Sequence, residues 1–131
     1  TGVTADGGVN YITLRYADVL LMYAEALNET GKTTEAHTYL NLIRTRAGLA
    51  GLSGLSKTDF SLALEKERRV EFLHEGMRWF DLVRTGRAQI VLNAYFAGKG
   101  FNFKVDAYEL LMPIPQSEID INPKLVQNPG Y

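Results

Sequence analysis

Apolar residues recur at helical spacing near the start of the chain, between residues 16 and 27. Five of them share one face, and other apolar residues fill the opposite side, so the predicted helix is covered on most of its circumference. The five are Tyr16, Leu20, Tyr23, Ala24 and Leu27. Thr13 is the expected N-cap, and Gly31 is placed to end the helix in a left-handed conformation.

A second helix is predicted to begin at Thr33 or Thr34 and to end at Gly48. Its residues divide into an apolar stripe and a side expected to face away from the core: Ala36, Leu40, Ile43 and Ala47 against His37, Asn41, Arg44 and Thr45. Because the connection is so short, the two helices must pack antiparallel. The small residues Ala24 and Ala36 then lie near the crossing, which favours a tetratricopeptide-like helical hairpin.

The remainder of the chain predicts further helical pieces and then an extended tail. The helical pieces are a third helix that starts at Thr58 with Asp59, a short helix over residues 78–84 stopped by Gly86, and a last piece over about residues 87–96. Prolines from Pro113 onward keep residues 110–116 extended, and residues 116–120 allow one helical turn. The pattern predicts a mainly α fold with a proline-containing C-terminal strap, organised as a single domain over residues 1–131.

Composition excludes several classes of function. The chain has 131 residues with 14 Lys plus Arg against 15 Asp plus Glu, so it lacks the basic field that a nucleic acid requires. It has no cysteine, which removes disulfides, thiolate metal sites and cysteine nucleophiles. The most apolar run, residues 19–24, is far shorter than the roughly 20 residues that span a bilayer. The sequence contains no glycine-rich phosphate loop or nucleophile elbow, and no cofactor is expected.

A dense run of charged residues covers positions 65–75. Glu67, Glu71 and Glu75 are four apart, and paired carboxylates can perform acid–base chemistry on a glycosidic bond. Such carboxylates must face each other across the sugar, however, whereas these three share one helix face. We therefore expect a structural ion-pair network that links the third helix to the short helix after Gly76. Its expected members are Arg68, Arg69, Glu71, Arg78, Asp81 and Arg84, with Asp81 and Arg84 spaced to pair on one face.

Neither histidine completes a metal-binding pattern. Glu71 and His74 form half of a di-iron signature, but Thr34 stands three residues before His37, where the second glutamate would be needed. His74 followed by Glu75 also fails as a zinc-protease motif, because Arg78 takes the position of the second histidine. No metal site is predicted.

Two groups of aromatic residues could serve as sugar platforms. Trp79 and Phe80 stand beside other apolar residues at helical spacing, which favours the core. Tyr95 and Phe101 surround a glycine-rich turn together with Phe103, where exposed rings are easier to accommodate. Tyr95 and Phe101 are therefore the candidate carbohydrate-binding residues.

Seven stretches of the chain, in order, resemble the C-terminal part of the SusD/RagB family. They are RYADVLLMYAEA (15–26), NLIRTRAG (41–48), ERRVEF (67–72), EGMRWFDLVRTG (75–86), LMPIPQ (111–116), EIDINP (118–123) and QNPGY (127–131). The resemblance covers most of the chain, and a single piece would have been much weaker support than seven in the family's order.

The resemblance implies a helical fold with tetratricopeptide-like pairs and a non-catalytic glycan-binding protein for nutrient uptake. It also implies a cell-surface location at the outer membrane, a lipid anchor outside this chain, and a SusC-type TonB-dependent porin as partner. The chain would then be a fragment, and the matched motifs are framework, so none of them transfers as a ligand-binding residue. Two other readings remain: a helical-repeat adaptor that binds proteins without sugar binding, and a glycoside-acting enzyme that uses the carboxylates of residues 67–75.

Overall fold

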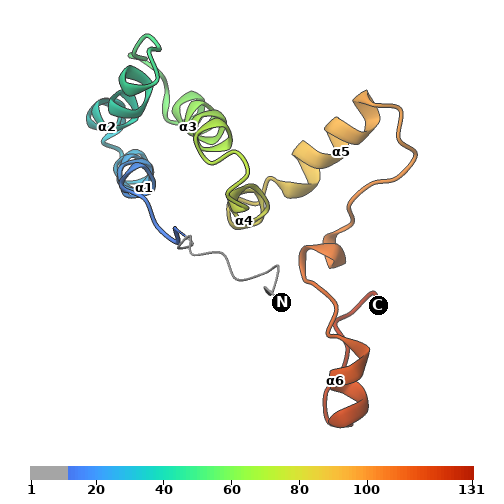
Figure 1. The fold of residues 1–131 in the computed structure, drawn as a ribbon. Coiled ribbons are helices and arrows are strands. Elements are labelled where there is room, and N and C mark those ends of the chain that lie inside the picture. The colour runs from blue at the N-terminus through green and yellow to red at the C-terminus, as the bar shows by residue number, and fades with distance from the viewer. Residues whose placement is uncertain (1–11) are drawn as a thin grey trace, which may run out of the picture. The chain divides into compact units, whose positions relative to one another are not determined.

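The computed structural model describes residues 12–131, which contain α-helices, one 3-10 turn and no strand (Figure 1). In chain order the elements are α1 (Tyr16–Glu29), α2 (Thr33–Arg46), α3 (Lys57–Glu71), α4 (Met77–Arg84), α5 (Ala88–Gly98), the 3-10 turn η1 (Ala107–Leu110) and α6 (Gln116–Ile121). The predicted mainly α fold is confirmed. The chain divides into two compact units, of which the first ends at Glu75 and the second begins at Gly76. A single-domain organisation stays a prediction.

The first unit is built on the predicted hairpin of α1 and α2. Gly31 has a φ of +83°, a left-handed conformation that reverses the chain between the two helices. Ala24 of α1 and Ala36 of α2 are fully buried, so their lack of a larger side chain lets the helices approach closely. The tetratricopeptide-like hairpin is confirmed.

Helix α3 completes the core of this unit. Leu21, Leu40 and Phe60, one from each helix, are fully buried. The buried amide of Asn28 also joins α1 to α3, because its Nδ2 donates to the Ser61 hydroxyl at 2.9 Å and to the Lys57 carbonyl at 3.1 Å. The unit therefore has an apolar centre contributed by all three helices.

Three local predictions for this unit are corrected. Helix α1 begins after Arg15, which makes no side-chain cap, and Thr13 lies outside the helix. Helix α3 begins at Lys57 with Ser56 as its N-cap, because the Ser56 hydroxyl accepts the Asp59 N–H at 3.1 Å. His37 is buried rather than turned away: its Nδ1 bonds the Thr33 carbonyl at 2.7 Å, and its ring packs edge-on against Phe60.

The second unit has a smaller buried apolar core, in which Leu82 and Ala88 are the buried hydrophobic residues among positions 76–131. Helix α4 ends before Gly86 as predicted, and α5 agrees with its predicted span to within two residues. Phe80 differs from its expected place in the core, because 68% of its surface is exposed. A helix as short as α4 buries only one face, and Phe80 lies on the other.

The C-terminal strap closes on itself through side-chain hydrogen bonds to backbone. The Gln127 amide accepts the Ile114 N–H at 2.8 Å and donates to the Ile114 carbonyl at 2.9 Å. Asn128 Nδ2 donates to the Met112 carbonyl at 2.7 Å, and the Tyr131 hydroxyl donates to the Leu111 carbonyl at 3.0 Å. These bonds take the place of a partner strand for a segment that contains prolines.

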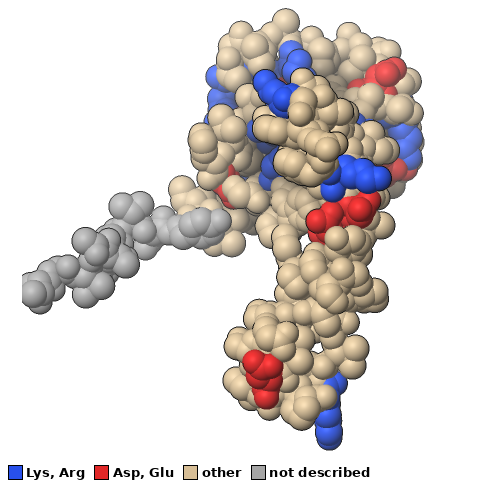
Figure 2. All heavy atoms as spheres, turned by 90° about the vertical axis from the view of Figure 1, so that its right-hand side faces the viewer, with Lys and Arg blue, Asp and Glu red and all other residues tan. Residues whose placement is uncertain are grey.

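Most side chains on the face of the strap and α6 seen in Figure 2 are uncharged, with isolated acidic and basic groups. Within residues 12–131, no helix is both long enough and apolar enough to cross a membrane.

Candidate functional site

The charged residues of α3 form part of a network with Arg15, which directly precedes α1, and with two arginines of α2. Glu71 lies at its centre: one carboxylate oxygen accepts from Arg15 Nη1 at 2.9 Å, and the other accepts from Arg46. The Glu71 carbonyl also accepts from Arg15 Nη2 at 2.9 Å. Both the carboxylate and the backbone carbonyl of Glu71 are thereby bound by residues that precede α3 in the chain.

Arg15 binds Glu75 at the same time. Its Nε donates to Glu75 Oε2 at 2.9 Å and its Nη2 to Oε1 at 2.7 Å, which is the bidentate geometry of a guanidinium and a carboxylate. Hydrogen bonds from the carboxylates of Glu75 and then Glu71 raise the pKa of Arg15 above its ordinary value. The Arg15 side chain is therefore a permanent cation that holds two carboxylates together.

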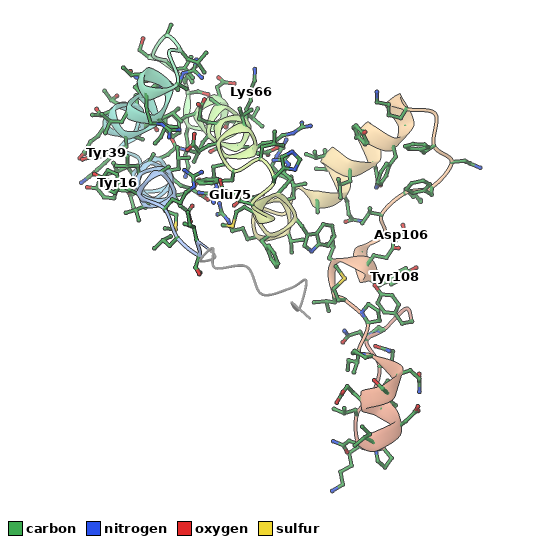
Figure 3. All side chains as sticks on the ribbon, in the orientation of Figure 1. Tyr16, Tyr39, Lys66, Glu75, Asp106 and Tyr108 are labelled. Atoms are coloured by element: carbon green, nitrogen blue, oxygen red, sulfur yellow. The ribbon has the colours of Figure 1, made fainter. Side chains whose placement is uncertain are left out.

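The backbone of the turn after α3 positions Glu75 for this contact. His74 has a φ of +68° and Gly76 a φ of +76°, so left-handed residues flank Glu75 on both sides. Such a φ is uncommon for a residue other than glycine. Figure 3 labels Glu75 at this turn, where the first unit ends.

Two further pairs extend the network along α3. Arg44 of α2 pairs with Glu67 at 2.8 Å, and Arg68 pairs with Asp18 of α1 at 2.7 Å. Both members of the Arg68–Asp18 pair are buried. The Phe72 ring contacts two guanidinium groups, with Arg15 at 4.9 Å and Arg68 at 5.0 Å from its centroid. We call the set of Arg15, Asp18, Arg44, Arg46, Glu67, Arg68, Glu71, Phe72 and Glu75 the arginine–carboxylate network.

This arrangement differs from the one expected of a glycosidase. Glu67, Glu71 and Glu75 each bind an arginine, so their oxygens are occupied by the protein's own cations. A general acid needs a carboxyl group that faces the glycosidic oxygen, whereas these three carboxylates face the protein's own arginines. The network is suited to joining helices.

The structure places the predicted network members as follows. Arg68 and Glu71 pair with groups of α1 and α2, and Arg69 is exposed on α3. Within α4, Asp81 accepts from Arg84 Nη2 at 2.9 Å, as their spacing predicts, and Arg78 is half-buried. The expected link between α3 and the short helix stays a prediction.

Sequence reasoning missed Arg15, Asp18, Arg44, Arg46 and Phe72 as members of the network. It noted Glu67 and Glu75 only as part of the carboxylate stripe. Asp18 carried a usable signal, because it is an acidic residue inside an otherwise apolar helix, and a buried carboxylate requires a cation. Arg44 and Arg46 gave no comparable signal, since interactions with the last carbonyls of α2 explain their place in its last turn equally well.

A cluster of four aromatic rings surrounds the end of α5. The rings of Tyr95, Phe101 and Phe103 each pack against Phe96, with centroid distances of 5.8, 6.2 and 4.5 Å. Phe101 and Phe103 are nearly parallel, with an angle of 19° and a centroid distance of 5.4 Å. We call these four residues the aromatic cluster. It brings together the two predicted candidates, Tyr95 and Phe101, and adds Phe96 and Phe103.

Within residues 12–131, the carboxylates and histidines form no group of three or more that could hold a metal ion.

The fold and the network together define a class of protein: a helical-hairpin protein in which the charged residues of the third helix form ion pairs with the two preceding helices and their flanking residues. The sequence model of the SusD family matches residues 3–131. The chain belongs to the SusD family.

Relatives within the family include two proteins of Formosa agariphila. The chain is 35% identical to SusD-like protein P2 over 136 residues, covering 96% of this chain and 27% of the relative. It is 36% identical to SusD-like protein P38, covering 93% of this chain and 25% of the relative. The chain therefore spans about a quarter of the length of these curated relatives.

Solved structures agree with the fold. A surface glycan-binding protein A from Bacteroides uniformis matches with a TM-score of 0.76 and 42% identity, covering 91% of this chain and 27% of that one. A SusD homolog from Bacteroides thetaiotaomicron matches with a TM-score of 0.79 and 31% identity, covering 98% of this chain and 30% of that one.

Proposed function

We propose that the protein is a non-catalytic component of glycan uptake, which binds starch or another polysaccharide. The observation that carries this is membership of the SusD family together with 42% identity to a surface glycan-binding protein. The arginine–carboxylate network supports the non-catalytic part, because the glutamates suited to glycoside chemistry by spacing are bound to arginines.

The chain acts as the C-terminal part of a longer protein at the cell surface. Its coverage of about a quarter of each curated relative supports this. The longer protein is held at the outer membrane by a lipid anchor that lies outside residues 1–131, and it passes its ligand to a SusC-type TonB-dependent porin. In this arrangement the first unit is framework.

A second candidate function, a protein-binding helical adaptor, is favoured by one observation. Helix α1 exposes Tyr16, Val19, Met22 and Tyr23, and tyrosine and methionine are enriched in protein interfaces. A SusC-type porin is itself a protein partner, so the two candidates differ in whether sugar is also bound.

The proposal is tested in the bacterium that encodes the protein. Deleting the gene should abolish retention of fluorescent starch, or of the polysaccharide on which the gene is induced, at the cell surface. Purification of the tagged gene product should recover a TonB-dependent porin. Recovery of the porin with unchanged glycan retention would favour the adaptor. Unchanged glycan retention without recovery of a porin would contradict the proposal.

A further inference from the structure

We propose that Arg15 acts as a latch that ends α3 at Glu71 from outside the helix, and that its release lets α3 extend by one turn to Glu75. The latch consists of the hydrogen bonds from the Arg15 guanidinium to these two glutamates, all within the first unit. It makes the end of α3 depend on a side chain that directly precedes α1. This inference does not depend on the proposed glycan-binding function.

The first support is the backbone carbonyl of Glu71. In a continuous α-helix this carbonyl accepts the N–H of the residue four positions later, which is Glu75. In the structure it accepts Arg15 Nη2 at 2.9 Å, and the Glu75 N–H donates instead to the Phe72 carbonyl at 3.0 Å. Arg15 therefore occupies the acceptor that α3 needs in order to continue.

The same guanidinium also binds the residue that carries the donor. Arg15 Nε donates to Glu75 Oε2 at 2.9 Å, and its Nη2 donates to Glu75 Oε1 at 2.7 Å. The planar fork of arginine has enough donors to bind a carboxylate and a carbonyl at once. One side chain thus holds both the Glu71 carbonyl and the Glu75 side chain in the geometry of the turn.

The second support is the backbone of the turn. His74 has a φ of +68°, a left-handed conformation that costs free energy in a residue with a Cβ. A further turn of α3 would remove this cost, because helical residues have negative φ. The turn therefore persists because the bonds of Arg15 offset the cost, and their loss favours the helical conformation of residues 72–75.

A second end for α3 is already present in the sequence. Gly76 has a φ of +76°, and a left-handed glycine directly after the last residue is a common end of a helix. An α3 that runs to Glu75 would end at Gly76 without any change in the conformation of the glycine. Residues 72–75 contain no proline or glycine that would oppose the additional turn.

The latch is more open to solvent than the rest of the network around α3. The Arg15 side chain is 25% exposed and that of Glu75 is 38% exposed, whereas both members of the Arg68–Asp18 pair are buried. Arg15 has an extended backbone and lies outside α1. A rearrangement of the chain before α1 can therefore withdraw Arg15 and leave the buried pair intact. Release would convert most of the link between α3 and α4 into helix.

The test is NMR spectroscopy on the 131-residue chain. A helical turn over residues 71–75 gives an NOE between the Glu71 Hα and the Glu75 amide proton, which should be absent from the unaltered chain. Arg15→Lys keeps the charge but cannot bind the carbonyl and the carboxylate together, so this NOE should appear. Arg46→Lys is the matched control, because it changes a bond to the Glu71 carboxylate and keeps the latch, and α3 should still end at Glu71.

Two substitutions of His74 test the turn while Arg15 and Glu75 stay in place. His74→Gly removes the cost of the left-handed conformation, so it should raise the melting temperature and leave the NOE absent. His74→Ala keeps that cost and increases helix propensity, so the NOE should appear in part of the molecules. If Arg15→Lys prevents folding, the two His74 variants decide the outcome.

Two results would overturn the latch. One is an α3 that ends at Glu71 in every folded variant, including His74→Ala. The other is an α3 that extends in Arg46→Lys to the same degree as in Arg15→Lys, because the carboxylate of Glu71 rather than its carbonyl would then control the end of the helix.

Discussion

Glu71 is the residue on which two arginines of different helices converge. Its side chain is 9% exposed and accepts from Arg15 and Arg46. Arginine suits both places, because its planar fork keeps its charge and can bind a carboxylate and a carbonyl at once. Arg15 does this with the Glu71 carbonyl and the Glu75 carboxylate. One side chain just before α1 thus fixes the last turn of α3.

Replacing Glu71 by Gln tests whether this carboxylate stabilises the fold. The substitution removes the counter-charge of Arg46 and leaves Arg15 with Glu75 alone. We expect the free energy of unfolding to fall by about 1–3 kcal/mol, less than for a fully buried pair. Thermal melting measures the effect. Glu29→Gln is the control, since Glu29 pairs with Lys57 where both are more than half exposed, and it should cost no more than about 0.5 kcal/mol.

The same variant tests the alternative that the protein is a glycoside-acting enzyme. If Glu71→Gln abolished hydrolysis of a glycoside while the melting temperature stayed unchanged, a catalytic role for the glutamates would replace the structural one.

Tyr39 gives the first unit a dependence on alkaline pH. Loss of hydration, and after it the electrostatic interaction with Tyr23, raises the pKa of Tyr39 above its ordinary value of about 10. The unfolded chain therefore ionises first as pH rises, so stability is complete below about pH 10 and is lost as pH approaches the folded pKa. Tyr39→Phe should reduce this loss in urea unfolding between pH 8 and 11. The control Tyr95→Phe should leave the decline in place, and an equal effect of both would contradict the assignment.

At the scale of elements, the close crossing of α1 and α2 depends on residue size. Ala24 has no exposed surface, so Ala24→Leu must displace its neighbours, and we expect a loss of about 1–3 kcal/mol in urea unfolding. Ala26→Leu is the matched control on the same helix, because Ala26 is exposed and the change should be within about 0.5 kcal/mol. Equal losses would show that the hairpin does not pack as described.

The strap offers a second test at this scale. Gln127→Ala removes both bonds to Ile114, so the Ile114 N–H should exchange with solvent at least tenfold faster, measured by hydrogen-exchange NMR. Gln116→Ala, which loses a bond to Asp120 on the exposed side of α6, should leave the exchange at Ile114 unchanged. Unchanged exchange in the Gln127 variant would mean that other groups hold the strap.

The sequence predicted elements better than it predicted contacts. Periodicity located the hairpin, and glycines located the helix ends, because both signals are local in the chain. The prediction placed the N-cap at Thr13, but the helix start is fixed by the bonds of Arg15 to Glu71 and Glu75. These two residues are far from Arg15 in the sequence, so no local pattern reveals the contact. His37 was placed outside on polarity alone, whereas a bond to the Thr33 carbonyl allows its burial. Of the aromatic cluster, the glycine-rich turn indicated Tyr95 and Phe101 but gave no ring geometry.

At the scale of the whole molecule, burial differs between the two units. Apart from Leu82 and Ala88, all buried hydrophobic residues of the described chain lie at or before Phe72. Local stability follows buried apolar contacts. We therefore expect amide exchange to be slowest in α1, α2 and α3 and faster throughout residues 76–131, as mass spectrometry of exchanged peptides would measure. Equal protection in both units would contradict this distribution.

Gly130 has a consequence for the evolution of the strap. Its φ of +102° already disfavours other residues, and a Cβ built on it would overlap the side chain of Tyr108. Tyr108 in turn packs edge-on against Tyr131. A lineage that kept the tyrosine at position 108 could not exchange the glycine at position 130, so the two sites should covary: glycine would be replaced only in homologues that carry a smaller residue opposite it.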